Sequence, residues 1–373
     1  MAVAAPVEVQ PPKIRNDLLQ EFRGLAAVLV LLYHAHDTFL SPRNLGTSYN
    51  FCGGIFRAGY SAVDFFFVLS GFLMVHVHRR EEGQPAFRKL FFLKRFLRIY
   101  PPYWGAVAIL YPLWMFTPRL NGVDRDLSGG KLLETILLTP QGQSYLISPA
   151  WSLTYEVFFY LIFGLVFFLR RGAFATLGVA WFAAVVAAYA SPAVGSYLGA
   201  NEWLGVAFGT RNVGFLGGCL VGYLAAVLSP RIKIPTFWIG LAGLVTIWAL
   251  DIVDDRRTSL ATFTFAYAAA SSLIVLGSTA VNLGRRGWMI LLGDASYSIY
   301  ITHMAGMALM VRVGLKLGLA QRIGLFATST TYVLGTIGVG VAFHFAAERP
   351  LMAVAKKIIA RVKRPTHAVP IPA

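Results

Sequence analysis

Two ionisable side chains lie within one long apolar stretch, FRGLAAVLVLLYHAHDTFL, at residues 22–40. Arg23 stands near its start, and His34 follows eleven positions later. Because an α-helix turns by about 100° per residue, eleven steps return to within about 20° of the first direction, so both side chains share one face about 16 Å apart. Ionisable groups inside a membrane are costly and usually mark a functional site. The simpler alternative stays open, in which Arg23 is a flanking positive charge and His34 an interhelical hydrogen-bond partner.

Three more ionisable residues fall inside predicted membrane-spanning stretches. Asp64, Glu156 and His303 lie, like His34, at middle to outer depth when residues are counted along helices of about 20 residues. An imidazole is well suited to take a proton near pH 7, and a neighbouring carboxylate can orient it or balance its charge. The shared depth predicts that these two histidines and two carboxylates form one site, with independent structural pairs as the alternative.

A strongly basic segment, HVHRREEGQPAFRKLFFLKRFLRIYPPYW, occupies residues 76–104. Arg95 and Arg98 are three positions apart and therefore share a helix face. Pro101 and Pro102 are expected to break or kink that helix. Since Arg pairs bidentately with phosphate, the segment predicts a mouth for a polyanionic ligand. An interfacial helix that binds anionic lipid is the alternative.

The composition is that of a membrane protein. Of the 373 residues, 57 % are hydrophobic and 13 % are charged, against about 25 % charged in soluble domains. The net charge of +16 does not indicate nucleic-acid binding, because most of the basic residues gather in loops on one predicted side. The two cysteines, Cys52 and Cys219, have no spacing typical of a zinc site or a disulfide framework, and no metal is expected.

Ten stretches are predicted to span the bilayer. Of the 33 Lys and Arg residues, 22 fall on the side of the N-terminus, so both termini are predicted to be cytoplasmic. We therefore expect an all-α polytopic protein with a cytoplasmic tail at 1–19, a transmembrane domain at 20–347 that begins with a retained first helix, and a basic cytoplasmic tail at 348–373. The predicted spans are 20–40, 58–78, 99–117, 151–169, 173–190, 211–228, 236–252, 259–279, 288–310 and 323–345.

Five motifs in series resemble the acyltransferase-3 family of bacterial inner-membrane acyltransferases. They are FRGLAAVLVLLYHA, GYSAVDFFFVLSGFLM, RFLRIYPPYW, PAWSLTYEVFFYL and LGDASYSIYITHM, in the order in which the chain presents them. The resemblance covers nearly the whole chain and is nearest in character to exopolysaccharide O-acetyltransferases. It implies a multi-pass protein of the bacterial inner membrane, in contact with lipid and not with nucleic acid.

The resemblance also implies an activity. Such a protein moves an acyl group, with acetyl expected, from acyl-CoA to a hydroxyl of an exopolysaccharide, lipid-linked sugar or related glycan. Carried over motif by motif, the resemblance makes Arg23 and His34 the central catalytic pair. Asp64 is the carboxylate of the motif GYSAVDFFFVLSGFLM, and Glu156 is that of PAWSLTYEVFFYL. His303 joins the catalytic set on the ground of its depth.

The donor is then acyl-CoA, with acetyl-CoA expected. Its phosphates are predicted to bind Arg95 and Arg98, together with Arg23, and its pantetheine arm to run along the first helix toward His34. A neutral His34 would act as general base on the acceptor hydroxyl, with an acyl-histidine intermediate as the mechanistic rival.

Two other functions remain open from the sequence alone. A carrier or flippase for a lipid-linked sugar would use the same intramembrane charges as a translocation path. A receptor or scaffold without chemistry would leave the common depth of the ionisable residues without a purpose. Release of free thiol from acyl-CoA separates the enzyme from both.

Overall fold

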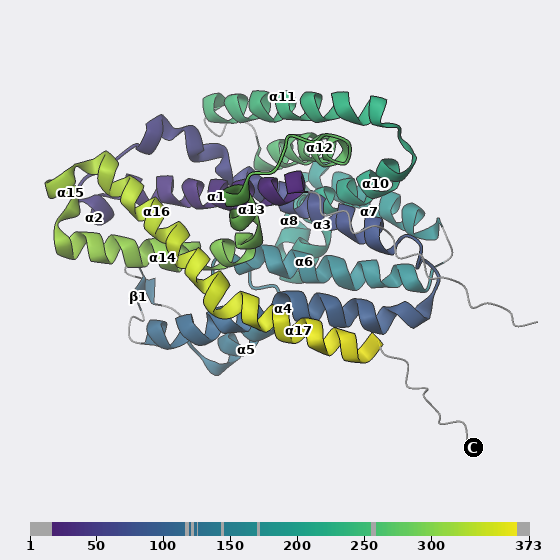
Figure 1. Cartoon of the computed structure of the whole chain (residues 1–373), viewed down its shortest axis with the longest axis horizontal. Helices are drawn as coiled ribbons and strands as arrows, with labels where there is room; N and C mark the ends of the chain where they lie inside the picture. Colours follow the sequence, from purple (N-terminus) through teal and green to yellow (C-terminus); the bar gives the residue numbers. More distant parts are fainter. Residues whose placement is uncertain are drawn as a thin grey trace, which may run out of the picture.

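The computed structural model describes residues 17–115, 119–120, 123–124, 126–142, 145–169, 172–254 and 259–363, and most of them are helical (Figure 1). This confirms the predicted all-α class, to which the described residues add one short antiparallel ladder of β1 (Arg119–Leu120) and β2 (Val123–Asp124). The α-helices are α1 (Asp17–Leu40), α2 (Pro42–Leu45), α3 (Ala62–His78), α4 (Arg88–Met115), α5 (Gly129–Leu137), α6 (Ala150–Phe163), α7 (Ala173–Ala190), α8 (Pro192–Ala200), α9 (Glu202–Phe208), α10 (Asn212–Val227), α11 (Pro230–Asp254), α12 (Leu260–Ser278), α13 (Gly287–Asp294), α14 (Ser296–Leu317), α15 (Leu319–Ile323), α16 (Leu325–Phe343) and α17 (Arg349–Lys363). Three 3₁₀ segments, η1 (Phe51–Ser61), η2 (Pro85–Phe87) and η3 (Gly164–Phe167), and one π-helical turn, η4 (His344–Glu348), complete the set.

Nine helical stretches among the described residues are long and apolar enough to cross a membrane, where ten were predicted. The difference is the predicted span 99–117. Its residues as far as Met115 belong to α4, a helix of 28 residues that is not one of the nine. The arginines, lysines, prolines and tyrosines of α4 explain this, because they lower its hydropathy. The prediction that both termini are cytoplasmic stays a prediction.

α4 also continues without a break through Pro101 and Pro102, where a break or kink was expected. Its aromatic side chains bind the neighbouring short helix α5: the Tyr103 hydroxyl donates to the carbonyl of Thr135 (2.9 Å), and the Trp104 indole N–H donates to that of Ile136 (3.0 Å). Tertiary packing of this kind outweighs the local preference of proline to end a helix. Arg95 and Arg98 therefore lie on the same continuous helix as the residues after the prolines.

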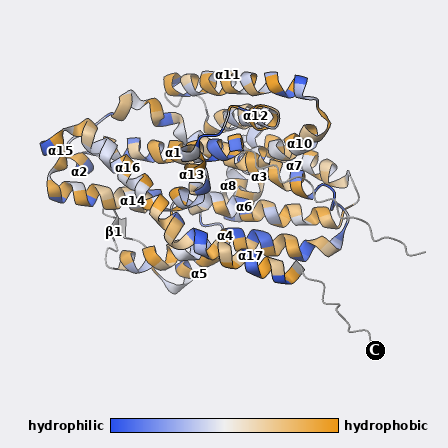
Figure 2. Ribbon diagram, viewed as in Figure 1, coloured by the Kyte–Doolittle hydropathy of each residue, from blue (hydrophilic) through white to orange (hydrophobic). Residues whose placement is uncertain are grey.

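The outside of the molecule is largely apolar, as contact with lipid requires. α11 lies along the upper edge in Figure 1 and is mostly hydrophobic in Figure 2. It buries Phe237 and Gly240 but exposes Trp238, Ile239 and Val245. In water such an exposed apolar surface would promote aggregation. In a bilayer it is the surface that contacts the lipid tails.

α1 lies near the middle of the bundle and contacts η1, α3, α12, α13, α14 and α16 (Figure 1). The predicted span 288–310 is two helices, because the chain turns at Ala295 between α13 and α14. α13 sits directly on α1: a Cβ on Gly24 would lie 2.7 Å from the backbone nitrogen of Gly293, and a Cβ on Gly293 would lie 2.1 Å from the carbonyl oxygen of Gln20. This close approach brings Asp294 beside the start of α1.

α3 and α10 also pack backbone to backbone. A Cβ on Gly71 would lie 2.0 Å from the Phe215 carbonyl oxygen, and one on Gly218 would lie 1.9 Å from that of Val68. Small residues that let membrane helices approach in this way are typical of their interfaces. The contact holds α3, which carries Asp64 at one end and Ser70 at its middle, in a fixed rotation.

The last predicted span does not end in a free tail. α16 passes through the π-helical turn η4 into α17, and α17 lies against α4 along the lower edge in Figure 1. The expected C-terminal tail, 348–373, thus includes a helix, while residues 364–373 and residues 1–16 of the expected N-terminal tail lie outside the described residues.

Candidate active site

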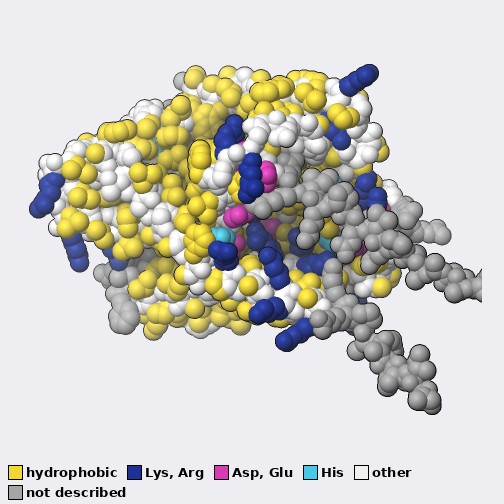
Figure 3. Space-filling model, in the orientation of Figure 1, with side chains coloured by type: hydrophobic (Ala, Val, Ile, Leu, Met, Phe, Trp, Pro, Cys, Tyr) yellow, Lys and Arg dark blue, Asp and Glu magenta, His cyan; other side chains and the backbone are white. Residues whose placement is uncertain are grey.

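One cavity of about 660 Å³ is lined by basic side chains from three separate parts of the chain. We call it the basic cavity. Its cations come from α1, α4 and α17, its carboxylates from α6, α13 and η4, and its apolar wall from α3. The charged residues that line it are Arg23, Arg95, Arg98, Arg349, Lys356, Glu156, Asp294 and Glu348. In Figure 3, basic, acidic and histidine side chains gather near the middle of the face, in the region where Figure 1 labels α13, α4 and α17.

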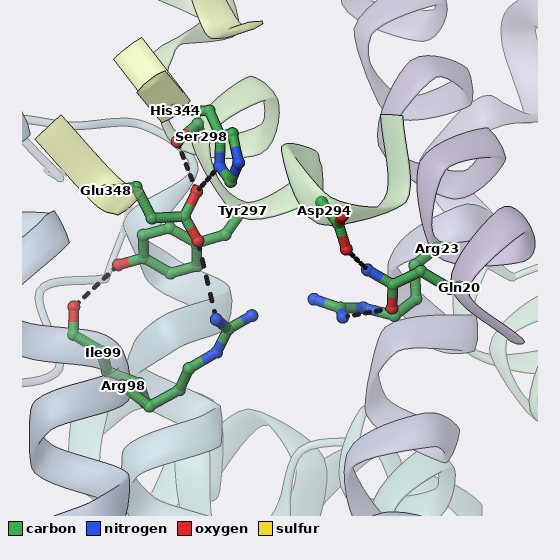
Figure 4. Close-up of polar contacts among 9 residues, drawn as sticks. All are labelled: Gln20, Arg23, Arg98, Ile99, Asp294, Tyr297, Ser298, His344 and Glu348. Atoms are coloured by element: carbon green, nitrogen blue, oxygen red, sulfur yellow. Dashed lines mark hydrogen bonds and ion pairs between the residues drawn. The ribbon is translucent and has the colours of Figure 1, made fainter. Parts of the chain in front are cut away.

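Arg23 and Arg98 aim their guanidinium groups into the same open space (Figure 4). Arg23 is held by one hydrogen bond, from its Nη1 to Gln20 Oε1 (2.9 Å), and Gln20 in turn donates from Nε2 to Asp294 Oδ1 (2.7 Å). The seating of α13 on α1 explains this chain of contacts. Two like charges facing one cavity repel each other, so the arrangement favours an anion between them.

Glu348 orients Arg98 from the π-helical turn. Its side chain is 2 % exposed and accepts hydrogen bonds at Oε2 from Ser298 Oγ (2.7 Å) and His344 Nδ1 (2.8 Å), while Oε1 lies 3.6 Å from Arg98 Nη1 (Figure 4). One carboxylate thus ties α14, η4 and α4 together at the cavity wall. π-helical turns often mark functional positions because they shift side chains out of the regular register.

Arg95 presents an unused donor. Its Nη2 donates to His78 Nε2 (3.5 Å), and His78 Nδ1 donates to Glu81 Oε2 (2.7 Å). The guanidinium also lies 5.4 Å from the centroid of the Tyr160 ring. Its Nε–H is buried without a hydrogen-bond partner among the described residues. A buried unpaired donor costs about 1–3 kcal/mol unless a ligand satisfies it.

A second, larger cavity of about 1110 Å³ contains the histidines. We call it the histidine cavity. The rings of His34 on α1 and His303 on α14 lie 5.0 Å apart between centroids. His303 Nδ1 lies 2.6 Å from the carbonyl oxygen of Tyr300, and because a carbonyl can only accept, Nδ1 carries the hydrogen. Nε2 is then the bare acceptor, buried and without a partner among the described residues.

The structure brings the rings of His34 and His303 together, and the predicted stripe from Arg23 to His34 lies along a continuous helix α1. The catalytic role of these residues stays a prediction. Neither Asp64 nor Glu156 is among the described residues that line the histidine cavity, although both were predicted to share the site of the histidines. Glu156 lines the basic cavity, where it accepts from Ser70 Oγ (3.3 Å) and from the Tyr160 hydroxyl.

Asp64 is fully buried and has a different partner. Both its carboxylate oxygens accept from Nη1 of Arg211, the residue just before α10, at 2.7 and 2.8 Å. Arg211 lines the histidine cavity and lies over the ring of Trp151, 5.7 Å from its centroid. Equal depth in the membrane does not say which way a side chain points around its helix axis, and this is why the two carboxylates were misplaced.

Several lining residues escaped the sequence reasoning. Glu348, His344 and Asp294 stand near predicted helix ends, where charges are usually solvated, so their burial had no local signal. The spacing of His344 and Glu348 at i, i+4 was the one available hint. Arg349 and Lys356 were taken as part of a basic tail, although the strong segregation of charge on α17 indicates a helix with one face on the protein. The described residues contain no group of three or more His, Cys, Asp or Glu that could hold a metal ion.

Comparisons with known proteins show the family of this chain. The acyltransferase-3 family, described as "Acyltransferase domain", matches residues 20–345, and the chain belongs to that family. It is a multi-pass membrane acyltransferase. The resemblance drawn from the five motifs is confirmed.

Two curated relatives come from rhizobia. The exopolysaccharide production protein ExoZ of Rhizobium meliloti (strain 1021) is 28 % identical over 324 residues, which cover 80 % of this chain and 92 % of the relative. Protein 2 in picA locus of Rhizobium radiobacter is 33 % identical over 167 residues, 40 % of this chain and 80 % of the relative. No solved structure matches.

Proposed function

We propose that this protein transfers an acetyl group from acetyl-CoA to a hydroxyl of an exopolysaccharide, a lipid-linked sugar or a related glycan in the bacterial inner membrane. The acyltransferase-3 family and the relative named for exopolysaccharide production support the reaction class and the acceptor class. The single observation that carries the proposal is the pair of adjoining cavities, one lined by Arg23, Arg95 and Arg98 and the other by three histidines, of which His34 and His303 have their rings together.

The basic cavity is the proposed donor site. Coenzyme A carries several phosphate charges, and Arg23, Arg95 and Arg98 offer donors from two helices, with Lys356 of α17 extending the positive lining. The unpaired Nε–H of Arg95 and the facing guanidinium groups both favour an anionic ligand. From Arg23 to His34 the axial distance along α1 is about 16 Å, which an extended pantetheine arm can span.

The histidine cavity is the proposed site of chemistry. His34 takes the proton of the acceptor hydroxyl as its oxygen attacks the thioester carbonyl carbon; the C–S bond then breaks, and the proton passes from His34 to the leaving sulfur. His303 Nε2 is free to accept a hydrogen bond from a neighbouring sugar hydroxyl. The rival route, through an acyl-histidine, uses the same residues in two steps.

The rest of the histidine cavity is suited to a glycan. Carboxylates of Asp37 and Asp251 offer acceptors to hydroxyl groups, and Trp151 offers an aromatic face. Asp251 Oδ2 already accepts from Tyr60 (2.8 Å) and Tyr267 (2.9 Å), which fixes its position. We assign the acceptor to this cavity and the donor to the other.

The test is release of free thiol from acetyl-CoA by the purified full-length protein, with and without a panel of glycan acceptors. We expect thiol release that rises with the correct acceptor and equals the acetyl groups found on it. A carrier or flippase would release no thiol with any acceptor, and that result would overturn the proposal.

A further inference from the structure

Two side chains line both cavities: Val63 of α3 and Tyr300 of α14. Both are nearly buried, with 4 % and 7 % of their surface exposed. We call these two side chains the shared wall. On one side of it lie the proposed phosphate-binding arginines, and on the other lie His34 and His303. The shared wall therefore stands between the proposed phosphate site and the proposed site of chemistry.

Tyr300 is held in place at its hydroxyl. The hydroxyl lies 2.7 Å from Ser152 Oγ, and Ser152 Oγ donates to the Pro149 carbonyl oxygen at 3.0 Å. Either oxygen can donate in the hydrogen bond between Tyr300 and Ser152, and in both arrangements it fixes the end of the Tyr300 side chain. The ring of Phe66 packs edge-on against the Tyr300 ring, 6.0 Å between centroids.

The hydrogen bond to Ser152 holds the Tyr300 side chain at its far end. At the other end of the residue, the Tyr300 carbonyl orients His303. What the Tyr300 side chain contributes is the fixed position of its ring.

We propose that Val63 and Tyr300 select the acyl group: they form the passage through which the acyl end of the donor thioester reaches the histidines, and they restrict it to two or three carbons. This inference rests on the proposed function. The acyl tail must pass the shared wall ahead of the carbonyl carbon. An acetyl group has one methyl beyond the carbonyl, whereas a longer chain would place its methylenes in the polar histidine cavity, where the acceptor has to bind.

The size of the effect follows from how apolar pockets discriminate. One methylene that a pocket cannot accommodate changes selectivity by roughly 10- to 200-fold. For the wild-type protein we expect butyryl-CoA to bind about 10-fold or more weakly than acetyl-CoA. We call the affinity for acetyl-CoA divided by that for butyryl-CoA the acetyl preference. Truncation of Val63 widens the passage without adding a polar group, so the acetyl preference should fall toward one.

The experiment is calorimetric titration of the purified full-length protein with unacylated coenzyme A, acetyl-CoA and butyryl-CoA. Val63→Ala should raise the affinity for butyryl-CoA relative to acetyl-CoA by about 10-fold, and Val63→Ile should lower it. The matched control is Val68→Ala, since Val68 is a buried valine of the same helix that lines neither cavity. It should leave the ratio unchanged.

A second pair of variants tests the position of Tyr300. Tyr300→Phe and Ser152→Ala each remove one half of the same hydrogen bond, so each should lower the affinity for acetyl-CoA relative to that for butyryl-CoA. The double variant should show nearly the same change as either single variant. The affinity for unacylated coenzyme A reports folding and phosphate binding in every variant.

The outcomes separate the two proposals. Equal binding of acetyl-CoA and butyryl-CoA in the wild type, or a ratio that no shared-wall variant changes, overturns the selection by Val63 and Tyr300 while leaving the proposed function standing. No binding of coenzyme A at all overturns the proposed function and the selection with it.

Discussion

His34 and His303 approach each other from two helices that are far apart in the sequence, and their facing rings are the residue-level feature on which the proposed transfer depends. His303 also has a defined tautomer, because its Nδ1–H binds a backbone carbonyl. Intramembrane histidines can serve as mere interhelical links. A buried Nε2 left without a partner among the described residues argues for a substrate contact instead.

Removal of the proposed base should abolish transfer. His34→Ala takes away the proton acceptor without adding a charge to the membrane, so expression and insertion should be retained while the rate falls by about 10²–10⁴. His303→Ala should also reduce the rate, by a smaller factor. The measurement is acyl transfer by purified variants, with His76→Ala, an exposed histidine on α3, as control. Wild-type turnover in His34→Ala would refute the assignment.

The arginines of α4 should act on binding rather than on the chemical step. Arg95→Ala and Arg98→Ala each remove a charged donor from the proposed phosphate site, at a cost of about 1.5–3 kcal/mol, or roughly 10- to 150-fold in affinity. The dependence of coenzyme A binding on ionic strength should weaken as well. Lys89→Ala, an exposed cation of the same helix that lines neither cavity, is the matched control. Unchanged affinity for coenzyme A in the double variant would contradict this assignment and would mean that the two arginines serve only to orient the chain in the membrane.

At this scale the sequence was informative where the relation between residues is local. The spacing of Arg23 and His34 follows from helix periodicity alone, and α1 is continuous through both. Equal depth placed His34 and His303 in one predicted site, and the structure brings their rings together. The same argument failed for Glu156 and Asp64, because rotation about the helix axis and the choice of neighbour, such as Arg211, are decided by tertiary packing.

At the scale of elements, one buried carboxylate in the π-helical turn η4 links this turn to two other helices, α14 and α4. Glu348 contacts Ser298 of α14, His344 of its own turn and Arg98 of α4. From the sequence, this glutamate only marked the inner end of the last span. A local sequence pattern does not predict which residue of another helix will contact this glutamate. The contacts of Glu348 could therefore be identified only from the structure.

Loss of Glu348 should therefore destabilise the bundle. Glu348→Ala leaves the buried donors Ser298 and His344 unpaired and should lower the free energy of unfolding by about 1–3 kcal/mol. The check is thermal unfolding in detergent, read from helical circular dichroism. Glu134→Ala is the control: its carboxylate is 52 % exposed, and its ion pair with Lys131 on α5 should be worth no more than about 1 kcal/mol. Equal melting of both variants would show that Glu348 is not a structural link.

Other elements show how far hydropathy alone can be followed. The span predicted at 173–190 coincides with α7, because an uninterrupted apolar run is a strong signal. The spans predicted at 99–117 and 288–310 were drawn over a proline-rich helix and over the turn between α13 and α14. In both places packing against neighbouring elements, α5 in one case and α1 in the other, determines the path of the chain.

For the whole molecule, the two cavities should open to opposite sides of the membrane, because the donor is made in the cytoplasm. Cys52 lies at the start of the helical stretch Phe51–His78, and Ala86 lies beyond its far end; both are exposed. Intact cells treated with a membrane-impermeant thiol reagent should label the native Cys52. A Cys52→Ser protein that carries Ala86→Cys should be labelled only after the cells are opened. Labelling of residue 86 in intact cells would put Arg95 and Arg98 on the wrong side for coenzyme A.

The central claim is that one chain takes acetyl from coenzyme A at the basic cavity and delivers it to a glycan hydroxyl through His34. The most direct measurement follows labelled acetyl from acetyl-CoA in purified protein, together with thiol release, for the wild type and His34→Ala. We predict one thiol released for each labelled acetyl that appears on the glycan in the wild type, and at least about 100-fold less of both in His34→Ala, with coenzyme A binding retained. Undiminished transfer by His34→Ala, or glycan binding by the wild type without any thiol release, would contradict the account.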